Sequence, residues 1–261
     1  MSSSSIYVCV FACLFLMSPA WAGVICDGVD DQLTTGQLGS VFFNTTATTI
    51  SLWVKPTGAA PAVAHLYEGQ SIFGDIDGGG GTYYGIYRHN NSGAGDEINC
   101  WNFVTSSFEV ATTTDNDTWT HLAYVQNGTS LTCYKNGVSA GSNTSTTSID
   151  LTNSGIVALC NVVSAGVTTV YAGEIADVRF FNTALTAAQV ETIAKSRLYT
   201  TGAQGTAGFP LAQCADGAAA TGVAFVDRTG NGATMTADDG ANNTGMLCSG
   251  SSMLAWPVGA N

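Results

Sequence analysis

Carboxylate side chains are the first residues of this sequence to weigh for chemistry, because hydrolysis of a glycosidic bond needs two of them, placed as acid and nucleophile. The chain has five glutamates, and its tempting carboxylate cluster is Glu174-Ile175-Ala176-Asp177. Residues three apart in a strand point to opposite faces of a sheet, so Glu174 and Asp177 cannot flank one bond. The sequence therefore predicts a protein that is not an enzyme.

Aromatic and amide side chains could instead bind sugar, which requires exposed ring faces with amide or carboxylate groups beside them. The stretch that follows the Gly-rich loop at 78–81 supplies both kinds of group. The alternative is that its aromatic side chains fill the core of the fold. We predict that ligand is bound by Tyr84, Tyr87, His89, Asn90 and Trp101.

Composition excludes several classes of partner. The 261 residues include 7 Lys and Arg against 19 Asp and Glu, which gives a formal net charge of -12 and a pI of about 4.2. Proteins that bind nucleic acid or anionic membranes need clustered cations, and these basic residues are scattered along the chain. Charged residues make up only 10% of the chain and hydrophobic residues 45%, so enough apolar side chains are present for a core. We expect an extracellular all-β protein with no nucleic-acid partner.

Residues 1–22 are predicted to be a signal peptide. The apolar run at 6–17 is too short to span a bilayer, and Ala20-Trp21-Ala22 forms a small-x-small cleavage site. The residues before the apolar run include no Lys or Arg, which departs from the usual signal-peptide pattern, and a membrane anchor is the alternative interpretation. No later stretch is long and apolar enough to span a membrane, so we expect a secreted protein with no span in the mature chain.

Six of the eight cysteines lie outside the predicted signal peptide, and an even number in a secreted chain favours disulfide bonds. Their spacing does not choose among the many possible pairings. Cys214 and Cys248 bracket one Gly-rich segment, and we predict a bond between them. No pair has the C-x-x-C spacing of zinc or redox sites.

Short strands are the elements that must position these side chains. Apolar or alternating runs separated by Gly, Asn, Asp and Ser predict many antiparallel strands. Asn127-Gly128 and Asn136-Gly137 flank the alternating run at 131–135, and both dipeptides favour hairpin turns. The predicted strands are 50–55, 64–67, 83–87, 101–104, 108–111, 119–125, 131–135, 156–160 and 170–181.

One predicted helix and a change in composition complete the organisation. Thr186 to Gln189 has a capping-box pattern, and apolar residues at helical spacing continue it to Lys195. We expect this helix to pack on the edge or convex face of a sheet. Residues 23–199 then form a single β-sandwich. The Gly- and Ala-rich segment 200–261 is either a small lobe or an extension wrapped on the sandwich, held by the predicted disulfide.

Three motifs follow one another along the predicted sandwich. The first joins residues 26–31 (CDGVDD) to the strand 50–56 (ISLWVKP). The second is W-x-H-hydrophobic at 119–122 with Y-x-N-G at 134–137, and the third is 173–186 (GEIADVRFFNTALT). Together they resemble the laminin-G-like domains of the concanavalin A-like lectin/glucanase superfamily, which usually have an aromatic residue where this chain has its first motif cysteine. The resemblance implies a two-sheet antiparallel jelly-roll sandwich with one short helix.

The resemblance also implies a structural calcium ion, which members of this superfamily often hold. Calcium takes several oxygen ligands, and the chain has fourteen aspartates. The resemblance points to Asp27, Asp30, Asp31 and Asp177 as ligands, and the loop 74–78 is a second candidate. The alternative is that these Asp-Gly stretches are ordinary turns.

The family also has a histidine at the position of His121, which we expect to be packed and hydrogen-bonded.

The resemblance implies three candidate functions. The favoured function is a secreted, non-catalytic laminin-G-like or lectin-like module that binds glycans or glycoproteins, with structural calcium. The second is a structural or adhesive component of an extracellular matrix, appendage or virion, with self-association. A glycoside hydrolase comes last, because the glucanase pattern E-x-D-x-x-E is absent.

Overall fold

Strands make up most of the part of the chain that the structure describes. The structure is a computed structural model, and the predicted signal peptide, the strand expected at 64–67 and the loop at 78–81 lie outside the residues it describes. No helix among the described residues is long and apolar enough to cross a membrane. The described residues are 23–35, 46–61, 69–75, 83–90, 96–103, 107–113, 116–144, 157–164, 167–195, 207–209, 211, 224–226, 234–238 and 247–249.

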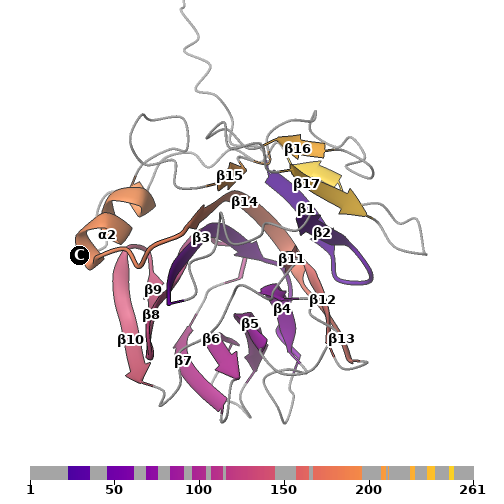
Figure 1. Cartoon of the computed structure of the whole chain (residues 1–261). Coiled ribbons are helices and arrows are strands. Elements are labelled where there is room, and N and C mark those ends of the chain that lie inside the picture. Colours follow the sequence, from indigo (N-terminus) through magenta and orange to yellow (C-terminus); the bar gives the residue numbers. More distant parts are fainter. Residues whose placement is uncertain are drawn as a thin grey trace, which may run out of the picture.

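Two antiparallel sheets form a sandwich (Figure 1), which confirms the predicted all-β architecture. Sheet A has the order β10 (Val138–Thr144), β9 (Ser130–Lys135), β8 (Thr120–Asn127), β3 (Ala47–Pro56), β14 (Ala172–Phe181), β1 (Gly23–Asp27) and β18 (Leu247–Ser249), and β15 (Ala207–Phe209) also pairs with β14. Sheet B has the order β16 (Ala224–Val226), β17 (Thr234–Asp238), β2 (Gln32–Thr35), β11 (Val157–Leu159), β4 (Gln70–Asp75), β5 (Tyr83–Asn90), β6 (Asp96–Phe103) and β7 (Ser107–Thr113). A separate hairpin pairs β12 (Asn161–Ser164) with β13 (Val167–Val170).

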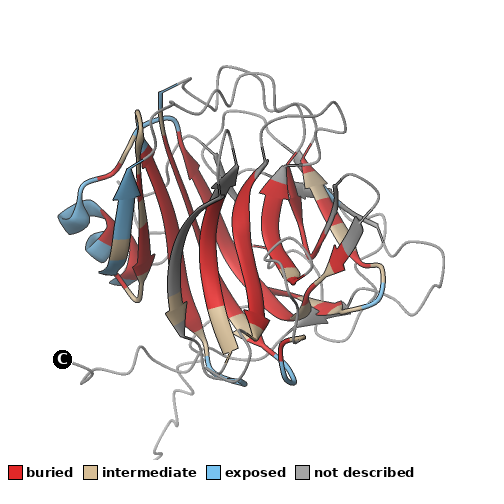
Figure 2. Cartoon of the chain, turned by 90° about the horizontal axis from the view of Figure 1, so that it is seen from below, coloured by how far each residue is buried: buried red, intermediate tan, exposed pale blue. Residues whose placement is uncertain are grey.

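The core lies between the sheets, where alternate side chains of each strand point inward. In β3 these are Ile50, Leu52 and Val54, as the alternation predicted. Phe73 of sheet B faces Phe180 of sheet A, with 6.4 Å between the ring centroids. Each such side chain contributes about 1.5–3 kcal/mol by leaving water. Figure 2 shows the result, with buried residues along the central strands and exposed residues on β10 and the outer turns of the helix.

A β-bulge interrupts the alternation in β14. Two residues of this strand, 177 and 178, stand opposite one residue of β3. Asp177 takes a φ of 50° there, and Ile175 and Val178 both reach the core although they are three apart. The strand-parity argument that separated Glu174 from Asp177 is therefore wrong at this position, because a bulge shifts the alternation by one residue.

Both Asn-Gly dipeptides lie at hairpin turns. Asn136 and Gly137 join β9 to β10 with φ values of 53° and 80°, the positive values that a two-residue type I′ turn requires. The Asn136 Oδ1 atom also accepts the backbone N–H of His121 at 2.9 Å, which ties this turn to β8. At the other dipeptide, Asn127 still pairs within β8 and the loop begins at Gly128, whose φ is 57°.

The predicted helix is α2 (Ala187–Lys195), and its capping box forms. The backbone N–H of Thr186 donates to Gln189 Oε1 at 2.8 Å, and that of Gln189 donates to Thr186 Oγ1 at 3.4 Å. Val190 and Ile193 pack with apolar side chains of β8, β9 and β14. The helix therefore covers part of the face of sheet A that points away from the core.

Two disulfides cross the core and join the sheets. Cys26 of β1 bonds Cys160, which follows β11, and Cys100 of β6 bonds Cys133 of β9. The sequence separations are 134 and 33 residues, so each bond closes a long loop. Loops of this length correspond to about 4–5 kcal/mol of stabilisation each in the chain-entropy model.

The segment 200–261 contributes strands to both sheets. β15 and β18 pair with β14 and β1 of sheet A, and β17 pairs with β2 of sheet B. Its described strands thus extend the sandwich and form no sheet of their own. Cys248 lies in β18, whereas Cys214 lies outside the described residues, so the disulfide between them stays a prediction.

Candidate functional site

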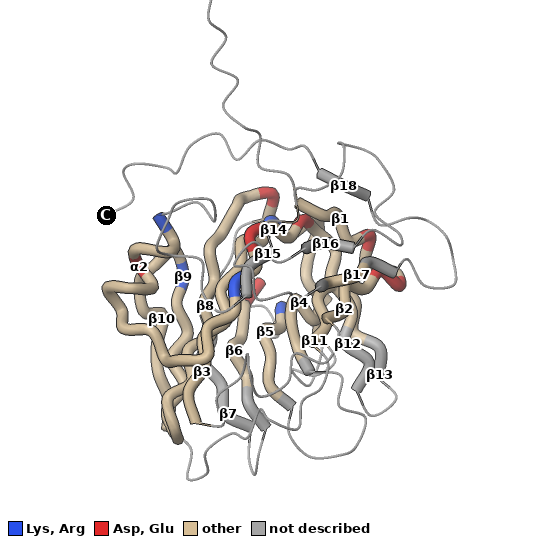
Figure 3. The backbone as a smooth tube through the Cα atoms, turned by 45° about the horizontal axis from the view of Figure 1, so that its top comes forward, with Lys and Arg blue, Asp and Glu red and all other residues tan. Residues whose placement is uncertain are grey.

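One end of the sandwich gathers most of the charged residues of its strands (Figure 3). At this end, called the charged end below, β1 and β3 stop at Asp27 and Pro56, and β5 and β6 meet between Asn90 and Asp96. The two sheets are tied here, since the backbone N–H of Ala60, after β3, donates to Asp96 Oδ1 at 3.2 Å. The predicted metal loop and part of the predicted sugar-binding stretch therefore share one end of the molecule.

Strands β5 and β6 place a mixed set of side chains on the face of sheet B that points away from the core. Their even-numbered residues up to position 86 in β5 and from 98 in β6 line the core, so the odd-numbered ones point outward. The register pairs residue 87 with 99 and residue 89 with 97. The outward set, called the sheet-B cluster below, consists of Tyr87, His89, Glu97, Asn99 and Trp101.

Burial changes the predicted sugar-binding set. Tyr84 is fully buried in the core, with its ring 6.2 Å from that of Tyr124 in the other sheet, and this removes it from the candidate site. Tyr87, His89 and Trp101 share the outward face but are only 3%, 5% and 4% exposed, so the open ring faces of the prediction are absent. The reason is that sequence alternation assigns a face to a side chain without saying what covers that face.

A glycine allows the two aromatic rings of the sheet-B cluster to meet. Gly85 stands opposite Trp101 in the register, and a Cβ at Gly85 would lie 2.7 Å from Cε2 of Tyr87. The Tyr87 ring therefore lies over a position that must have no side chain. It meets the Trp101 ring edge to face, with centroids 5.6 Å apart and planes at 88°.

The polar half of the cluster centres on His89. Its Nε2 atom faces Nδ2 of Asn99 in a short hydrogen bond and lies 3.9 Å from Oε2 of Glu97. Burial lowers the pKa of His89, and the Glu97 carboxylate opposes that shift, so the ring is neutral at pH 7. When the Asn99 amide donates to Nε2, the ring proton lies on Nδ1.

Two polar atoms of the cluster are left for a ligand. Among the described residues, His89 Nδ1 and Asn99 Oδ1 are buried and have no hydrogen-bond partner. Buried polar atoms are nearly always satisfied by protein, water or ligand. The cluster therefore offers one donor and one acceptor beside the Glu97 carboxylate and two aromatic rings.

The buried side chain of Arg88 connects several segments at the charged end, beside this cluster. Its partners come from β4, from the loop after β3, from β6 and from the segment before β8, so it connects both sheets. Removing it would leave several polar groups without their partner inside the protein. The Arg88 guanidinium donates to Gln70 Oε1 (2.9 Å), Gly58 O (2.6 Å), Asp96 Oδ2 (2.5 Å) and Asn116 Oδ1 (2.5 Å).

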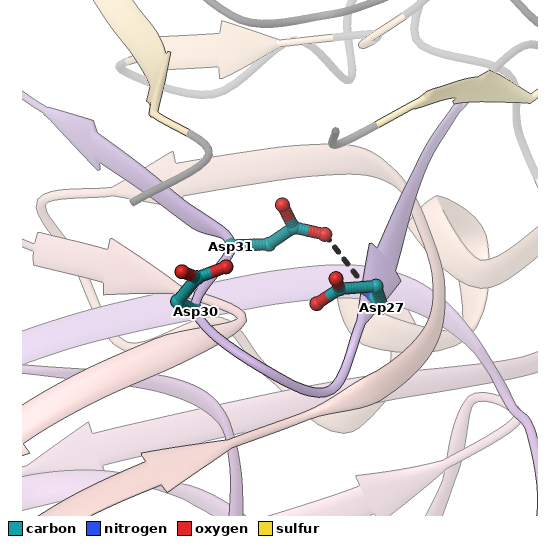
Figure 4. A group of neighbouring side chains, drawn as sticks. All are labelled: Asp27, Asp30 and Asp31. Carbon is teal, nitrogen blue, oxygen red and sulfur yellow. Dashed lines mark hydrogen bonds between the residues drawn. The ribbon is translucent and has the colours of Figure 1, made fainter. Parts of the chain in front are cut away.

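The loop between β1 and β2 brings three aspartates together (Figure 4). Asp27, Asp30 and Asp31, called the acidic triad below, each offer a carboxylate oxygen within 4.8 Å of the others. The Asp31 Oδ2 atom accepts the backbone N–H of Asp27 at 2.7 Å, and Asp27 Oδ1 accepts that of Val29 at 2.7 Å. Gly28 has a φ of 80°, which lets the loop turn tightly enough to converge these side chains.

The acidic triad fits a hard cation. Two oxygen ligands of one calcium ion are at most about 4.8 Å apart, since each bond is about 2.4 Å long. Asp31 is 2% exposed, and its Oδ1 atom has no hydrogen-bond partner among the described residues. Burial, together with the charges of Asp27 and Asp30, raises the pKa of Asp31 to about 6. A bound cation would give the Asp31 Oδ1 atom a partner and would offset the repulsion among the three carboxylates.

Asp177 does not join the triad, which removes the basis for predicting it as a metal ligand. Strands β1 and β14 are neighbours, as expected, but Asp27 pairs with Ala172. Asp177 is five residues further along β14, or about 17 Å at the rise of an extended strand. Its carboxylate is instead bound by Arg179, from Nε to Oδ1 at 2.9 Å and from Nη2 to Oδ2 at 2.6 Å.

A buried serine and histidine resemble part of a hydrolase relay without its access. The Ser51 Oγ atom lies 2.7 Å from His121 Nε2, and both residues are 1% exposed, so no substrate reaches them. Burial first, and Arg179 second, lower the pKa of His121 to about 3. The ring of Trp53 packs against His121 at 5.4 Å. This confirms the predicted packed, hydrogen-bonded histidine.

Glu97 and Asn99 are members of the cluster that the sequence prediction missed. A signal for them was available, because residues 97, 99 and 101 are spaced by two and must share one face of a strand. The pattern could not say which of the two faces lines the core, because both faces of β5 and β6 are rich in large side chains.

The sequence of this chain is similar to that of one known family. Residues 27–191 match the family described as the Concanavalin A-like lectin/glucanases superfamily. The match ends within α2, before the segment 200–261 that adds strands to both sheets. Comparison with curated proteins gives no match.

Solved structures resemble this chain at low sequence identity. A candidate carbohydrate-binding protein from Bacteroides ovatus aligns with 91% of this chain at 12% identity and a TM-score of 0.62, and the alignment spans 61% of that protein. NanB with optactamide aligns with 67% of this chain at 19% identity and a TM-score of 0.50, over 28% of its length. A heptameric SAP-like pentraxin from Limulus polyphemus gives 66% coverage, 17% identity, a TM-score of 0.47 and 81% of its length.

Proposed function

This chain belongs to the concanavalin A-like lectin/glucanases superfamily, and from that premise we propose that it is a secreted, non-catalytic carbohydrate-binding module. The two disulfides support secretion, because such bonds persist in oxidising compartments. The observation that carries the proposal is the sheet-B cluster, which combines aromatic rings with hydrogen-bonding groups that have no partner among the described residues.

The chemistry of the cluster suits a sugar. The buried Tyr87 and Trp101 rings form an apolar wall beside the polar groups, while His89 Nδ1 and Asn99 Oδ1 can exchange hydrogen bonds with the hydroxyl groups of a sugar that enters beside Glu97. Glu97 has a side chain 17% exposed, so a ligand would reach the cluster from its side. The structural neighbour from Bacteroides ovatus, described as a candidate carbohydrate-binding protein, supports the same proposal.

The ion pairs of the carboxylates support a binding role without hydrolysis. A glycosidase needs two carboxyl groups facing one bond, whereas the cluster has only Glu97. Glu174 Oε1 accepts from Lys55 Nζ at 2.8 Å, and Asp177 is bound by Arg179. These two carboxylates are therefore engaged, although the bulge in β14 lets both point away from the core.

We extend the proposal to calcium held by Asp27, Asp30 and Asp31. The loop that carries them leaves sheet A at β1 and enters sheet B at β2, beside the disulfide of Cys26 and Cys160. An ion there would supply the positive charge that three adjacent carboxylates lack and would hold the loop closed. Its role would be structural, since the sheet-B cluster lies on other strands of sheet B.

A glycan array with the oxidised mature protein tests the proposal, once with calcium and once with excess chelator. Saturable binding in both buffers supports a lectin in which calcium has a structural role or none. Binding that chelation abolishes supports a calcium-dependent lectin and calls for single Asp27→Asn, Asp30→Asn and Asp31→Asn variants. No binding in either buffer contradicts the proposal.

Two tryptophans provide a matched test of the site. Trp101 and Trp53 are 4% and 7% exposed, and they lie on the outer faces of sheets B and A. We expect Trp101→Phe to weaken glycan binding by about fivefold, because the edge-to-face contact that holds Tyr87 in the cluster contributes on the order of 1 kcal/mol. Trp53→Phe should leave glycan affinity unchanged. Equal losses in both variants would place the ligand elsewhere.

A structural or adhesive role is the second candidate, and strand β10 favours it. β10 is the last described strand of sheet A on its side, and six of its seven residues are exposed, including Val138 at 69%. Exposed edge strands can pair with another chain. Light scattering over a range of concentrations tests this role, since assembly in the absence of any sugar affinity would favour it over the first proposal.

A further inference from the structure

We infer that the carbohydrate ligands of this protein are uncharged, and that glycans carrying an acidic sugar or a sulfate bind at least about tenfold more weakly than their neutral counterparts. The inference rests on the proposed function and assigns a specificity to the sheet-B cluster. It follows from which charges and which hydrogen-bonding atoms this face of the sandwich presents.

Recognition of an anionic sugar requires a cation within reach, most often an arginine. The described residues of β4, β5, β6 and β7 include one cation, Arg88, which is fully buried. All four of its hydrogen bonds go to protein groups at the charged end. Lys55, Arg179 and Lys195 are paired with carboxylates of β14 and α2, away from this face.

The cluster presents a negative charge instead. The Glu97 carboxylate stands at its exposed side and faces the His89 ring at 3.9 Å. That ring is neutral at pH 7 because burial lowers its pKa, so it does not cancel the charge of Glu97. The whole chain carries a formal charge of -12, which opposes the approach of any anion.

The hydrogen-bonding atoms of the cluster also favour a neutral sugar over an anionic one. A sugar hydroxyl can donate to Glu97 or to Asn99 Oδ1 and accept from His89 Nδ1, so neighbouring hydroxyls satisfy all three groups. A carboxylate or sulfate has acceptor atoms only. Placed here, it would face the Glu97 carboxylate and leave the Asn99 oxygen without a donor, which is how a site rejects the wrong ligand.

Matched pairs of glycans test the inference on the oxidised mature protein. The probes are neutral hexose and pentose oligosaccharides, each compared with the same oligosaccharide carrying a terminal sialic acid, uronic acid or sulfate. We expect the neutral member of each pair to bind at least about tenfold more tightly at low salt, with the difference narrowing as salt rises. Anionic glycans that bind as tightly as the neutral ones, or more tightly, overturn the inference and leave the proposed function standing. Absence of binding to every probe overturns both.

Two charge variants locate the effect. Glu97→Gln should reduce the discrimination between neutral and anionic glycans by at least about threefold, because it removes the carboxylate at the site. Glu191→Gln on α2 changes the net charge equally but lies on the outer face of sheet A, and it should leave the discrimination unchanged. Equal effects of both variants would assign the selectivity to net charge and overturn the assignment to the cluster. The comparison of glycan pairs on the unaltered protein decides the specificity even if a variant fails to fold.

Discussion

His121 and His89 occupy similar positions on the outer faces of the two sheets and have opposite electrostatic surroundings. Both are buried, and burial lowers the pKa of both. His121 lies near Arg179, whose own charge is bound by Asp177, and its Nε2 atom contacts Ser51. His89 lies instead beside the carboxylate of Glu97, which no described cation neutralises.

The difference separates a polar cluster that serves the fold from one suited to a ligand. Around His121 the charges of Arg179 and Asp177 cancel within the protein, although His121 Nδ1, like His89 Nδ1, has no hydrogen-bond partner among the described residues. Around His89 a carboxylate and two polar atoms remain available. A ligand can supply the missing donors and acceptors there and can enter beside the partly exposed Glu97 carboxylate, whereas Ser51 and His121 are 1% exposed.

The largest expected effect is the loss of the buried ion pair of sheet A. Arg179→Met would leave the Asp177 carboxylate buried without a counter-charge, and we expect the free energy of unfolding to fall by about 3–5 kcal/mol. Urea unfolding measures this change, and Arg179→Met combined with Asp177→Asn should recover part of it. Glycan affinity of the folded fraction should not change. Weaker glycan binding by the folded fraction of the variant would contradict the view that this ion pair serves only the fold.

Asp31 should give a pH dependence of the opposite sign to ordinary acid denaturation. Its pKa rises from 3.8 to about 6 on folding, so the folded state binds more protons between these values. Without metal, the contribution of Asp31 to stability therefore falls by up to about 3 kcal/mol as pH rises from 4 to 7. Asp31→Asn should remove this slope in chelator. The measurement is the difference in unfolding free energy between wild type and variant at each pH.

Calcium provides the control for that prediction. At pH 7 with calcium, wild type should become more stable than Asp31→Asn, because the ion favours the ionised carboxylate. A pH-independent difference between the two proteins in chelator would contradict the burial of a titrating Asp31. A difference that calcium does not alter would contradict the proposed metal site.

Substituting each histidine in turn tests the comparison between the two sheets directly. His121→Gln should lower the free energy of unfolding by about 1–3 kcal/mol at pH 7 and leave glycan affinity unchanged. Its folded pKa of about 3 lies below the unfolded 6.5, so its contribution is complete above pH 6.5 and is lost by about 1.4 kcal/mol per unit as pH falls. His89→Gln should mainly weaken glycan binding. Calorimetry of both variants checks the pattern, and a reversal of the two effects would contradict it.

The smallest expected effect concerns the helix that covers part of sheet A. Thr186→Ala removes one half of the capping box and should cost about 1 kcal/mol of stability. Thermal unfolding would record the change, and hydrogen exchange should show it at β8 and β9 beneath the helix. The amides of β5 and β6 should keep their protection, since Val190 and Ile193 of α2 pack on sheet A.

Much of the fold was readable from local sequence because the determining interactions are local. The alternation at 50–55 predicted β3, the Asn-Gly dipeptides predicted hairpins, and the capping box predicted the start of α2. The convergence of Asp27, Asp30 and Asp31 is also local, since one short loop contains all three. Each of these features depends on residues within a few positions of one another.

The sequence by itself determined where strands, turns and the helix form, because backbone preferences and alternation act over neighbouring residues. Only the tertiary structure decided that Tyr84 faces the core, that Glu97 and Asn99 join His89, and that Asp177 lies on the same outward face of β14 as Glu174. The first two depend on which face of β5 and β6 meets the opposite sheet, and the third on a bulge that shifts the alternation. These outcomes depend on contacts between segments far apart in the chain, which no local pattern specifies.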